Sequence, residues 1–286
     1  MVLVTEIPRN IARAFYGYDE WDIEAFASRW GGLHTAVFER ALAEGQGEDK
    51  VQAIFAIGYL ETPWAQERMW TLVESPQRKE RWASAVCLGA MHDERATPYL
   101  QRILLEGLDP EEPFDPEDEN WYAVKRDDVA RLLSSWGPST VVTTLRQSFL
   151  AVNRLREARP CPKYLFVYQD TLAYALGQRG ALGALTGVAL TEPQRRVAMI
   201  YLSLGLLRAD ERYPDMGAVS MLIVDQNLKQ EVAEVLAQQF GLSEDERLTV
   251  ISMFGRDSRR RKAETRGSTS DETDDVADEM DEAETE

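Results

Sequence analysis

Histidine and cysteine are scarce in this chain, with two of each among 286 residues. Neither His34 nor His92 has a second histidine or cysteine at the spacing of zinc ligands, and two histidines offer few bases for a nucleophile. The Gly-X-Ser-X-Gly motif and the glycine loops that bind nucleotides are also missing. We therefore predict no catalytic, metal-binding or cofactor-binding residues and no cofactor, which leaves enzymatic activity undecided and favours a non-catalytic protein.

Long apolar runs are missing as well. A membrane-spanning helix needs about 18 or more consecutive apolar residues, and no segment reaches that length. Residues 1–13 place their basic residues after a short apolar stretch, the reverse of the order in a secretory signal. We expect a cytoplasmic protein, in which Cys87 and Cys161 remain reduced thiols.

The net charge of −17 is concentrated in two segments. Residues 271–286 contain ten acidic and no basic residues, and residues 106–119 contain eight acidic residues. A basic block with six basic and two acidic residues spans 256–266. The remaining body is close to neutral, which makes nucleic acid an unlikely partner, because phosphate binding needs a basic surface.

An internal repeat with a period of 31 residues occupies the first half of the chain, where residues 50–60 align with residues 81–91. The matched pairs are Ile57 and Leu88, Gly58 and Gly89, Leu60 and Met91, Ala65 and Ala96, Met69 and Leu100, and Leu72 and Ile103. The apolar spacing is helical, so each copy is predicted to be a hairpin of two helices. We expect the first helix of each hairpin to end near the glycine, which adopts the left-handed C-cap conformation at little cost.

The turn between the helices carries a resemblance to a known family. An apolar-Gly-X-apolar motif is followed by Asp-Glu-Arg-Ala-Thr-Pro-Tyr-Leu at residues 93–100, with Pro98 in the first turn of the second helix. This pattern resembles the short HEAT-like repeats found in phycobilin lyases, over residues 50–105. The resemblance implies an α-solenoid, a stack of helical hairpins that bury their apolar faces against one another.

Looser copies extend this pattern. Candidate helices follow at 128–137, 139–149, 170–177, 180–185, 196–205, 231–241 and 244–251. The glycines of residues 177–183 are interpreted as an inter-helix turn. We therefore predict an all-α, irregular HEAT-like, armadillo-like solenoid of five or six hairpins over residues 1–254.

Two segments are predicted to lie outside the repeats. The first is an acidic, proline-rich insertion at residues 106–120, a solvated loop or an acidic lip on one face. The second is a disordered tail at residues 255–286, basic and then acidic, which has too few large apolar residues to fold.

Four side chains are candidates for an interaction surface. Trp64 follows a proline in an inter-helix turn, where an aromatic ring can anchor a partner. Arg78, Lys79 and Arg81 place three cations at a loop between repeats, and the segment 193–196 contains a similar cluster. Both basic clusters have an alternative interpretation as solvated helix starts.

The function predicted from these observations is a non-catalytic HEAT-like scaffold that mediates protein–protein interaction with an unknown partner. A phycobilin-lyase-like enzyme or chaperone partner is the alternative that the resemblance implies. A HEAT-like DNA-binding or base-excision protein is a weaker alternative.

Overall fold

The computed structural model describes residues 28–31, 35–58, 62–106, 108, 119–158, 163–209 and 225–252, and every regular element in these ranges is helical. The elements are α3 (Thr35–Glu44), α4 (Glu48–Gly58), α5 (Pro63–Leu72), α6 (Arg78–Ala90), η2 (Glu94–Ala96), α7 (Thr97–Leu105), α8 (Glu119–Trp136), α9 (Val141–Ala158), α10 (Lys163–Gln178), η3 (Leu182–Leu185), α11 (Glu192–Leu207) and α13 (Gln226–Phe240). A last short helix covers 244–252. The all-α prediction is confirmed. No helix in the described ranges is long and apolar enough to cross a membrane.

Helix ends follow the capping residues of the sequence. Thr62 precedes α5, where its Oγ1 accepts a hydrogen bond from the Ala65 amide at 3.2 Å and Pro63 occupies the first turn. Asp225 caps α13 in the same way, with Oδ1 accepting from Leu228 N at 3.1 Å. Gly241 ends α13 in the left-handed conformation, with φ 67°. Local sequence therefore determines where these helices begin and end.

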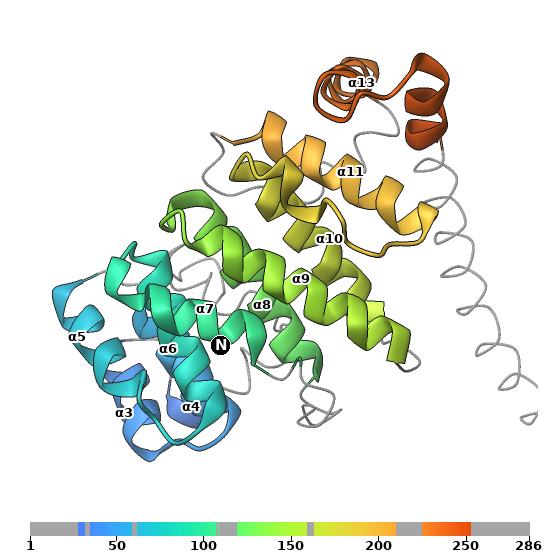
Figure 1. Ribbon diagram of the computed structural model, residues 1–286. Coiled ribbons are helices and arrows are strands. Elements are labelled where there is room, and N and C mark those ends of the chain that lie inside the picture. The colour runs from blue at the N-terminus through green and yellow to red at the C-terminus, as the bar shows by residue number, and fades with distance from the viewer. Residues whose placement is uncertain are drawn as a thin grey trace, which may run out of the picture.

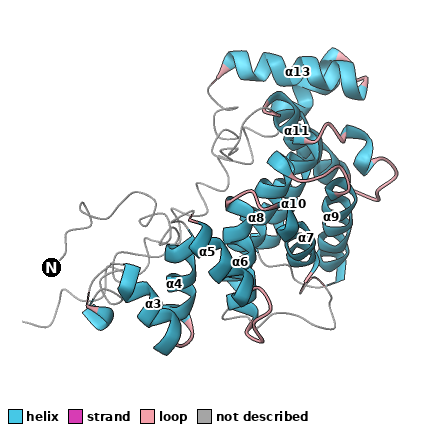
Figure 2. Cartoon of the chain, turned by 90° about the vertical axis from the view of Figure 1, so that its left-hand side faces the viewer, coloured by secondary structure: helices cyan, strands magenta, loops and turns pink. Residues whose placement is uncertain are grey.

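The helices pack in two rows. In the first row, α4, α6, α8, α10 and α11 each pack against the next. In the second row, α7 packs against α9, and α9 against η3. The rows are joined because α5 packs on α6, α7 on α8 and α9 on α10. Figure 1 follows this order from α3 in blue to α13 in red, and Figure 2 shows α13 lying across α11 at one end of the stack.

The helices end near the repeat glycines as expected, α4 at Gly58 and α6 at Ala90, but the expected left-handed cap conformation of these glycines was wrong. Neither Gly58 nor Gly89 has a positive φ angle. A β-carbon on Gly58 would lie 2.3 Å from Cys87 Sγ, and one on Gly89 would lie 2.9 Å from Leu100 Cδ1. Both glycines are buried at close contacts between helices, where an added β-carbon would force the neighbouring side chain to shift.

A histidine takes the left-handed position at the end of α6 instead. His92 has φ 58°, and its amide donates to the Gly89 carbonyl while the Asp93 amide donates to the Leu88 carbonyl, each at 3.0 Å. This pair of hydrogen bonds is a Schellman motif, in which glycine is the usual residue. The His92 ring stacks on Trp136 of α8 with ring centroids 5.7 Å apart, a contact that glycine could not make.

Another pair of glycines places α11 against α10. A β-carbon on Gly177 would lie 2.1 Å from the Leu202 carbonyl oxygen, and one on Gly205 would lie 2.0 Å from the Tyr174 carbonyl oxygen. Because these obstacles are backbone atoms, the two helices can pack this closely only with glycine at both positions. The contact determines which face of α11 is turned away from α10.

The second helix predicted at 180–185 is only a short 3₁₀ turn. Gly180 and Gly187 have φ angles of 65° and 77°, and η3 occupies the four residues from Leu182 to Leu185 between them. A continuous α-helix cannot include left-handed residues of this kind, so the chain runs through residues 186–190 without regular structure. The predicted turn around 177–183 is present, and within the described ranges no full helix covers α11 on the η3 side.

The predicted tail at 255–286 and most of the predicted insertion lie outside the described residues. At its end, the insertion is shorter than expected, because α8 already begins at Glu119.

Candidate binding groove

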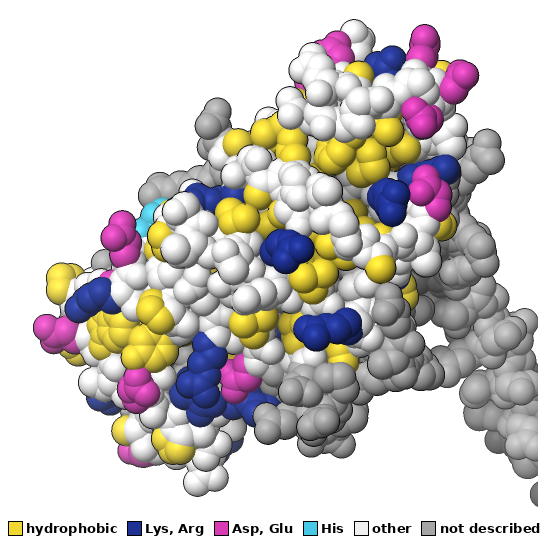
Figure 3. Space-filling view, viewed as in Figure 1, with side chains coloured by type: hydrophobic (Ala, Val, Ile, Leu, Met, Phe, Trp, Pro, Cys, Tyr) yellow, Lys and Arg dark blue, Asp and Glu magenta, His cyan; other side chains and the backbone are white. Residues whose placement is uncertain are grey.

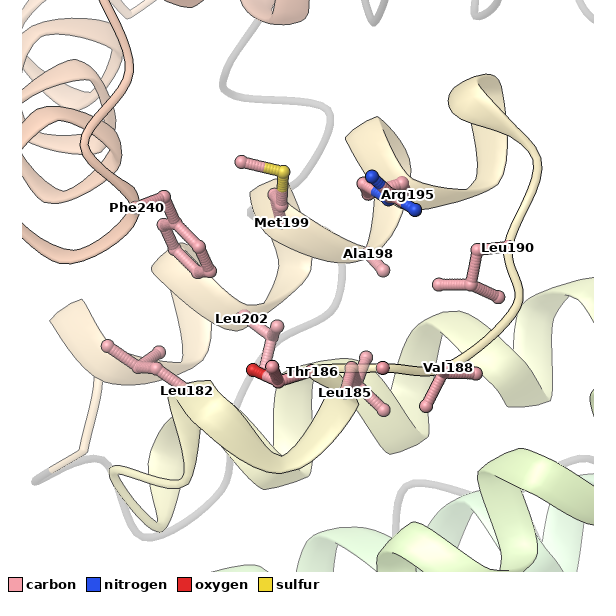
Figure 4. Close-up of a pocket in the computed structure, with 11 residues that line it drawn as sticks. Leu182, Leu185, Thr186, Val188, Leu190, Arg195, Ala198, Met199, Leu202 and Phe240 are labelled. Atoms are coloured by element: carbon pink, nitrogen blue, oxygen red, sulfur yellow. The ribbon is translucent and has the colours of Figure 1, made fainter.

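One face of α11 is turned toward an open groove. Arg195, Ala198, Met199 and Leu202 are spaced by three or four residues, so they lie on the same side of this helix. Thr191 precedes the helix and its amide donates to Gln194 Oε1 at 2.8 Å, which orients the first turn. Figure 4 shows Ala198 and Leu202 directed toward η3 and the segment that follows it, and Met199 directed toward Phe240.

The other walls come from η3, the irregular segment after it and the end of α13. Leu182 and Leu185 of η3 face α11, and Phe240 closes one end from the last turn of α13. The described residues that line it are Leu182, Leu185, Thr186, Gly187, Val188, Leu190, Arg195, Ala198, Met199, Leu202 and Phe240. The cavity measures about 420 Å³, within the range of roughly 300–1,000 Å³ that is typical of ligand sites.

A second compartment of about 550 Å³ continues from the first, and Arg195, Met199 and Phe240 line both. Its far side is formed by Leu242 and by the 244–252 helix, which contributes Asp245, Glu246, Thr249 and Val250. The two compartments are adjacent along α11 with Arg195, Met199 and Phe240 between them, and together they are called the groove. Figure 3 shows hydrophobic side chains gathered on the surface between α13 and α11.

Charged groups along the groove are unequally engaged. Glu192 Oε1 pairs with Arg196 Nε at 2.8 Å, and Glu246 Oε2 accepts from the Ser243 amide and hydroxyl at 2.8 and 2.7 Å. The Arg195 guanidinium, by contrast, has no hydrogen bond or ion pair with any residue in the described ranges. Among the described residues that line the first, apolar compartment, Arg195 is also the only charged one.

The four predicted surface residues lie at opposite ends of one hairpin. Trp64 is 41% exposed at the start of α5. Arg78, Lys79 and Arg81 lie at the start of α6, immediately after the short turn at residues 73–77. Since α5 and α6 pack against each other across this short turn, they run antiparallel. Trp64 and the basic cluster are therefore separated by the length of the hairpin and do not form a single surface.

The three cations of this cluster face carboxylates of their own chain. Arg78 Nε and Arg81 Nη2 lie 3.0 and 3.5 Å from Glu106 Oε1, and Lys79 Nζ lies 3.7 Å from Glu48 Oε2. The indole of Trp82 also donates to Glu106, at 2.9 Å. These ion pairs join α6 to its neighbours, which gives the cluster a structural role.

A buried carboxylate connects two successive hairpins. Asp93 accepts hydrogen bonds from Gln66 Nε2 at 2.8 Å and Trp70 Nε1 at 2.9 Å, both on α5. Arg95 donates to the same carboxylate from Nε at 2.9 Å and from Nη2 at 2.6 Å. Mainly through the hydrogen bond from Arg95, the pKa of Asp93 is lowered to about 2, so the Asp93 carboxylate is ionised at neutral pH.

Two ionisable groups in the helix rows have raised pKa values. Burial raises the pKa of the Asp127 carboxyl to about 7, and Oδ1 of this residue is buried without a hydrogen-bond partner. Burial also raises the pKa of the Cys87 thiol to about 12, which keeps the thiol protonated and unreactive at neutral pH. Neither residue lines the groove, and no cluster of three or more metal-ligating side chains occurs among the residues that the structure describes.

Comparison with models of known protein families, with curated proteins and with solved structures finds no match for this chain.

The groove was missed by sequence reasoning, although part of its signal is present in the sequence. The cations of the 193–196 segment are interpreted from sequence as a solvated helix start. In the structure Arg195 is exposed, whereas Arg196 is partly buried and pairs with Glu192. The spacing of Arg195 with Met199 and Leu202 and the glycines that interrupt the preceding segment could have indicated an incompletely covered helix.

Proposed function

We propose that this chain is a HEAT-like helical-repeat scaffold that binds another protein without catalysing a reaction, and that the groove along α11 is its binding site. The repeat architecture is supported by the pairs at a period of 31 residues. Ala65 and Ala96 are both fully buried, as are Met69 and Leu100. The order in which the helices pack also fits a solenoid, in which each hairpin contacts mainly its neighbours.

One observation carries the proposal: an apolar groove lies open where the second row shortens to η3. Aliphatic and aromatic side chains form most of the lining of the first compartment, and few polar groups converge there. Such a surface gains free energy by removing the apolar area of a partner from water, at about 25 cal/mol per Å². Solenoid proteins often bind peptides along surfaces of this kind.

Site-specific photo-crosslinking tests the proposal. A photoreactive phenylalanine analogue replaces Thr186, which is exposed and lines the groove. A matched variant carries the analogue at Val167, which is 48% exposed on α10 and is absent from the groove lining. We expect the Thr186 variant to form an adduct with a discrete protein in native lysate and the Val167 variant to form none with that protein. Identical adducts, or none at Thr186, would contradict the proposal.

A further inference from the structure

The chemistry of the groove specifies its partner more closely. We infer that the groove binds a protein segment in which a large apolar side chain is adjacent to a carboxylate, with the apolar group in the compartment formed by η3 and α11 and the carboxylate on Arg195. This inference rests on the proposed function and adds the identity of the recognised side chains.

The apolar part of the recognition follows from the first compartment. Leu182, Leu185 and Leu202 surround it, and Met199 and Phe240 separate it from the second. Methionine adapts its shape to different side chains, and an aromatic ring gives a rigid contact area. A segment that places a leucine, isoleucine, methionine or phenylalanine here buries apolar surface on several sides.

The acidic part follows from Arg195. Its guanidinium has no partner in the described ranges, although the neighbouring Arg196 is paired with Glu192. A guanidinium presents parallel N–H groups that match both oxygens of a carboxylate. Because Arg195 is exposed, such a pair contributes mainly to orientation and specificity. A carboxylate is therefore the complementary group for this position.

The second compartment limits where that carboxylate can lie. Asp245 lines the side of the groove opposite to η3, and no hydrogen bond or ion pair engages its side chain among the described residues. Its negative charge repels an acidic group on that side. The partner's carboxylate is therefore expected on the η3 side of Arg195, close to the apolar compartment, which is why the two features should be adjacent in the bound segment.

The geometry favours a peptide over a free fatty acid. Thr186 and Gly187 line the first compartment and are exposed, so the groove is open along one side. An alkyl chain gains most from an enclosed tunnel, whereas a peptide can leave its backbone in water and insert single side chains. If the protein bound a fluorescent fatty acid and bound no peptide, the inference would therefore be contradicted.

Selection from a phage-displayed library of random dodecapeptides tests the inference with the full chain as bait. We expect enriched peptides to share an apolar residue next to aspartate or glutamate. Fluorescence anisotropy measures the affinities of these peptides. Arg195→Glu should weaken binding of these peptides at least about tenfold, and selection on this variant should enrich lysine or arginine at the same position. Arg102→Glu, an equal charge reversal at an exposed position of α7, should leave binding unchanged.

A third variant separates failure of this inference from failure of the proposed function. Thr186→Trp fills the groove from an exposed position, and its folding is checked by circular dichroism together with that of the other variants. If Thr186→Trp abolishes binding but the peptides share no acidic residue, or if Arg195→Glu binds them as well as the wild type, the inference is wrong and the proposed groove function stands. If no peptide is enriched, or if binding survives Thr186→Trp, the groove is not the binding site and both proposals fail.

Discussion

Replacing Gly205 by alanine should destabilise the protein strongly, although alanine favours helix. The added β-carbon would lie 2.0 Å from the Tyr174 carbonyl oxygen and 2.8 Å from the Gln178 amide nitrogen. Close carbon–oxygen contacts between helices are normally about 3.3 Å or longer, so α11 would have to withdraw by roughly 1.3 Å. Both obstacles belong to the α10 backbone and cannot rotate away.

The expected magnitude follows from two opposing terms. Inserting a methyl group into a close-packed contact costs about 1–3 kcal/mol, and a contact with immobile backbone belongs at the upper end of that range. Alanine recovers up to about 1 kcal/mol through its higher helix propensity. The free energy of unfolding should therefore fall by about 2 kcal/mol or more.

Urea unfolding followed by far-ultraviolet circular dichroism measures this change through the transition midpoint. Gly183→Ala is the matched control, because among the described residues only Thr186 Oγ1, at 3.9 Å, lies within 4 Å of its added β-carbon. That substitution should change stability by less than about 0.5 kcal/mol. A Gly205→Ala protein as stable as the wild type would refute the close approach of α10 and α11, and with it the orientation of the groove.

Three further substitutions probe the ionic groups of the helix rows. Asp93→Asn should cost about 1.5–3 kcal/mol at pH 7 in urea unfolding, since it removes charge-assisted hydrogen bonds. Because folding lowers the Asp93 pKa to about 2, this contribution to stability should be present at neutral pH and be lost as the pH falls from about 4 to 2. Equal effects of Asp93→Asn at pH 7 and at pH 2 would contradict the lowered pKa. Asp127→Asn should stabilise the protein at pH 8 and not at pH 4. Because the folded pKa of Asp127 is about 7, ionising this buried carboxyl makes the wild-type protein less stable as the pH rises from about 4 to 7. A thermal melt that shows no gain in stability at pH 8 would exclude a buried, ionised Asp127. Glu106→Gln should lower the melting temperature by an amount that added salt reduces, since it removes the pairs with Arg78 and Arg81.

Much of the helix pattern could be predicted from local sequence. The apolar spacing and the period of 31 residues located α4 to α7, and Thr62 marks the start of α5 through its own side chain. These features depend on residues within one or two helical turns, so no knowledge of distant neighbours is needed.

The role of the repeat glycines could not be read in the same way. A glycine near a helix end favours both a left-handed cap and a close helix contact, and the sequence pattern is the same for both. Gly58 and Gly89 serve the contact because Cys87 and Leu100 lie against them, and those neighbours are brought there only by packing.

The basic cluster illustrates the same limit for function. Arg78, Lys79 and Arg81 are adjacent in sequence and look like a free cationic surface. Glu48 begins α4 and Glu106 directly follows α7, and packing brings their carboxylates within ion-pair distance of the cluster. Charge along the chain therefore did not reveal which cations already have partners.

The sequence by itself determined that the chain is helical and repetitive, because helix periodicity and capping act over a few residues. Only the tertiary structure decided where the groove lies. Its walls come from η3, α11 and α13, and their meeting depends on the close contact of Gly177 and Gly205 between α10 and α11. Whether Arg195 has a partner is likewise a property of this packing, since it depends on residues far apart along the chain.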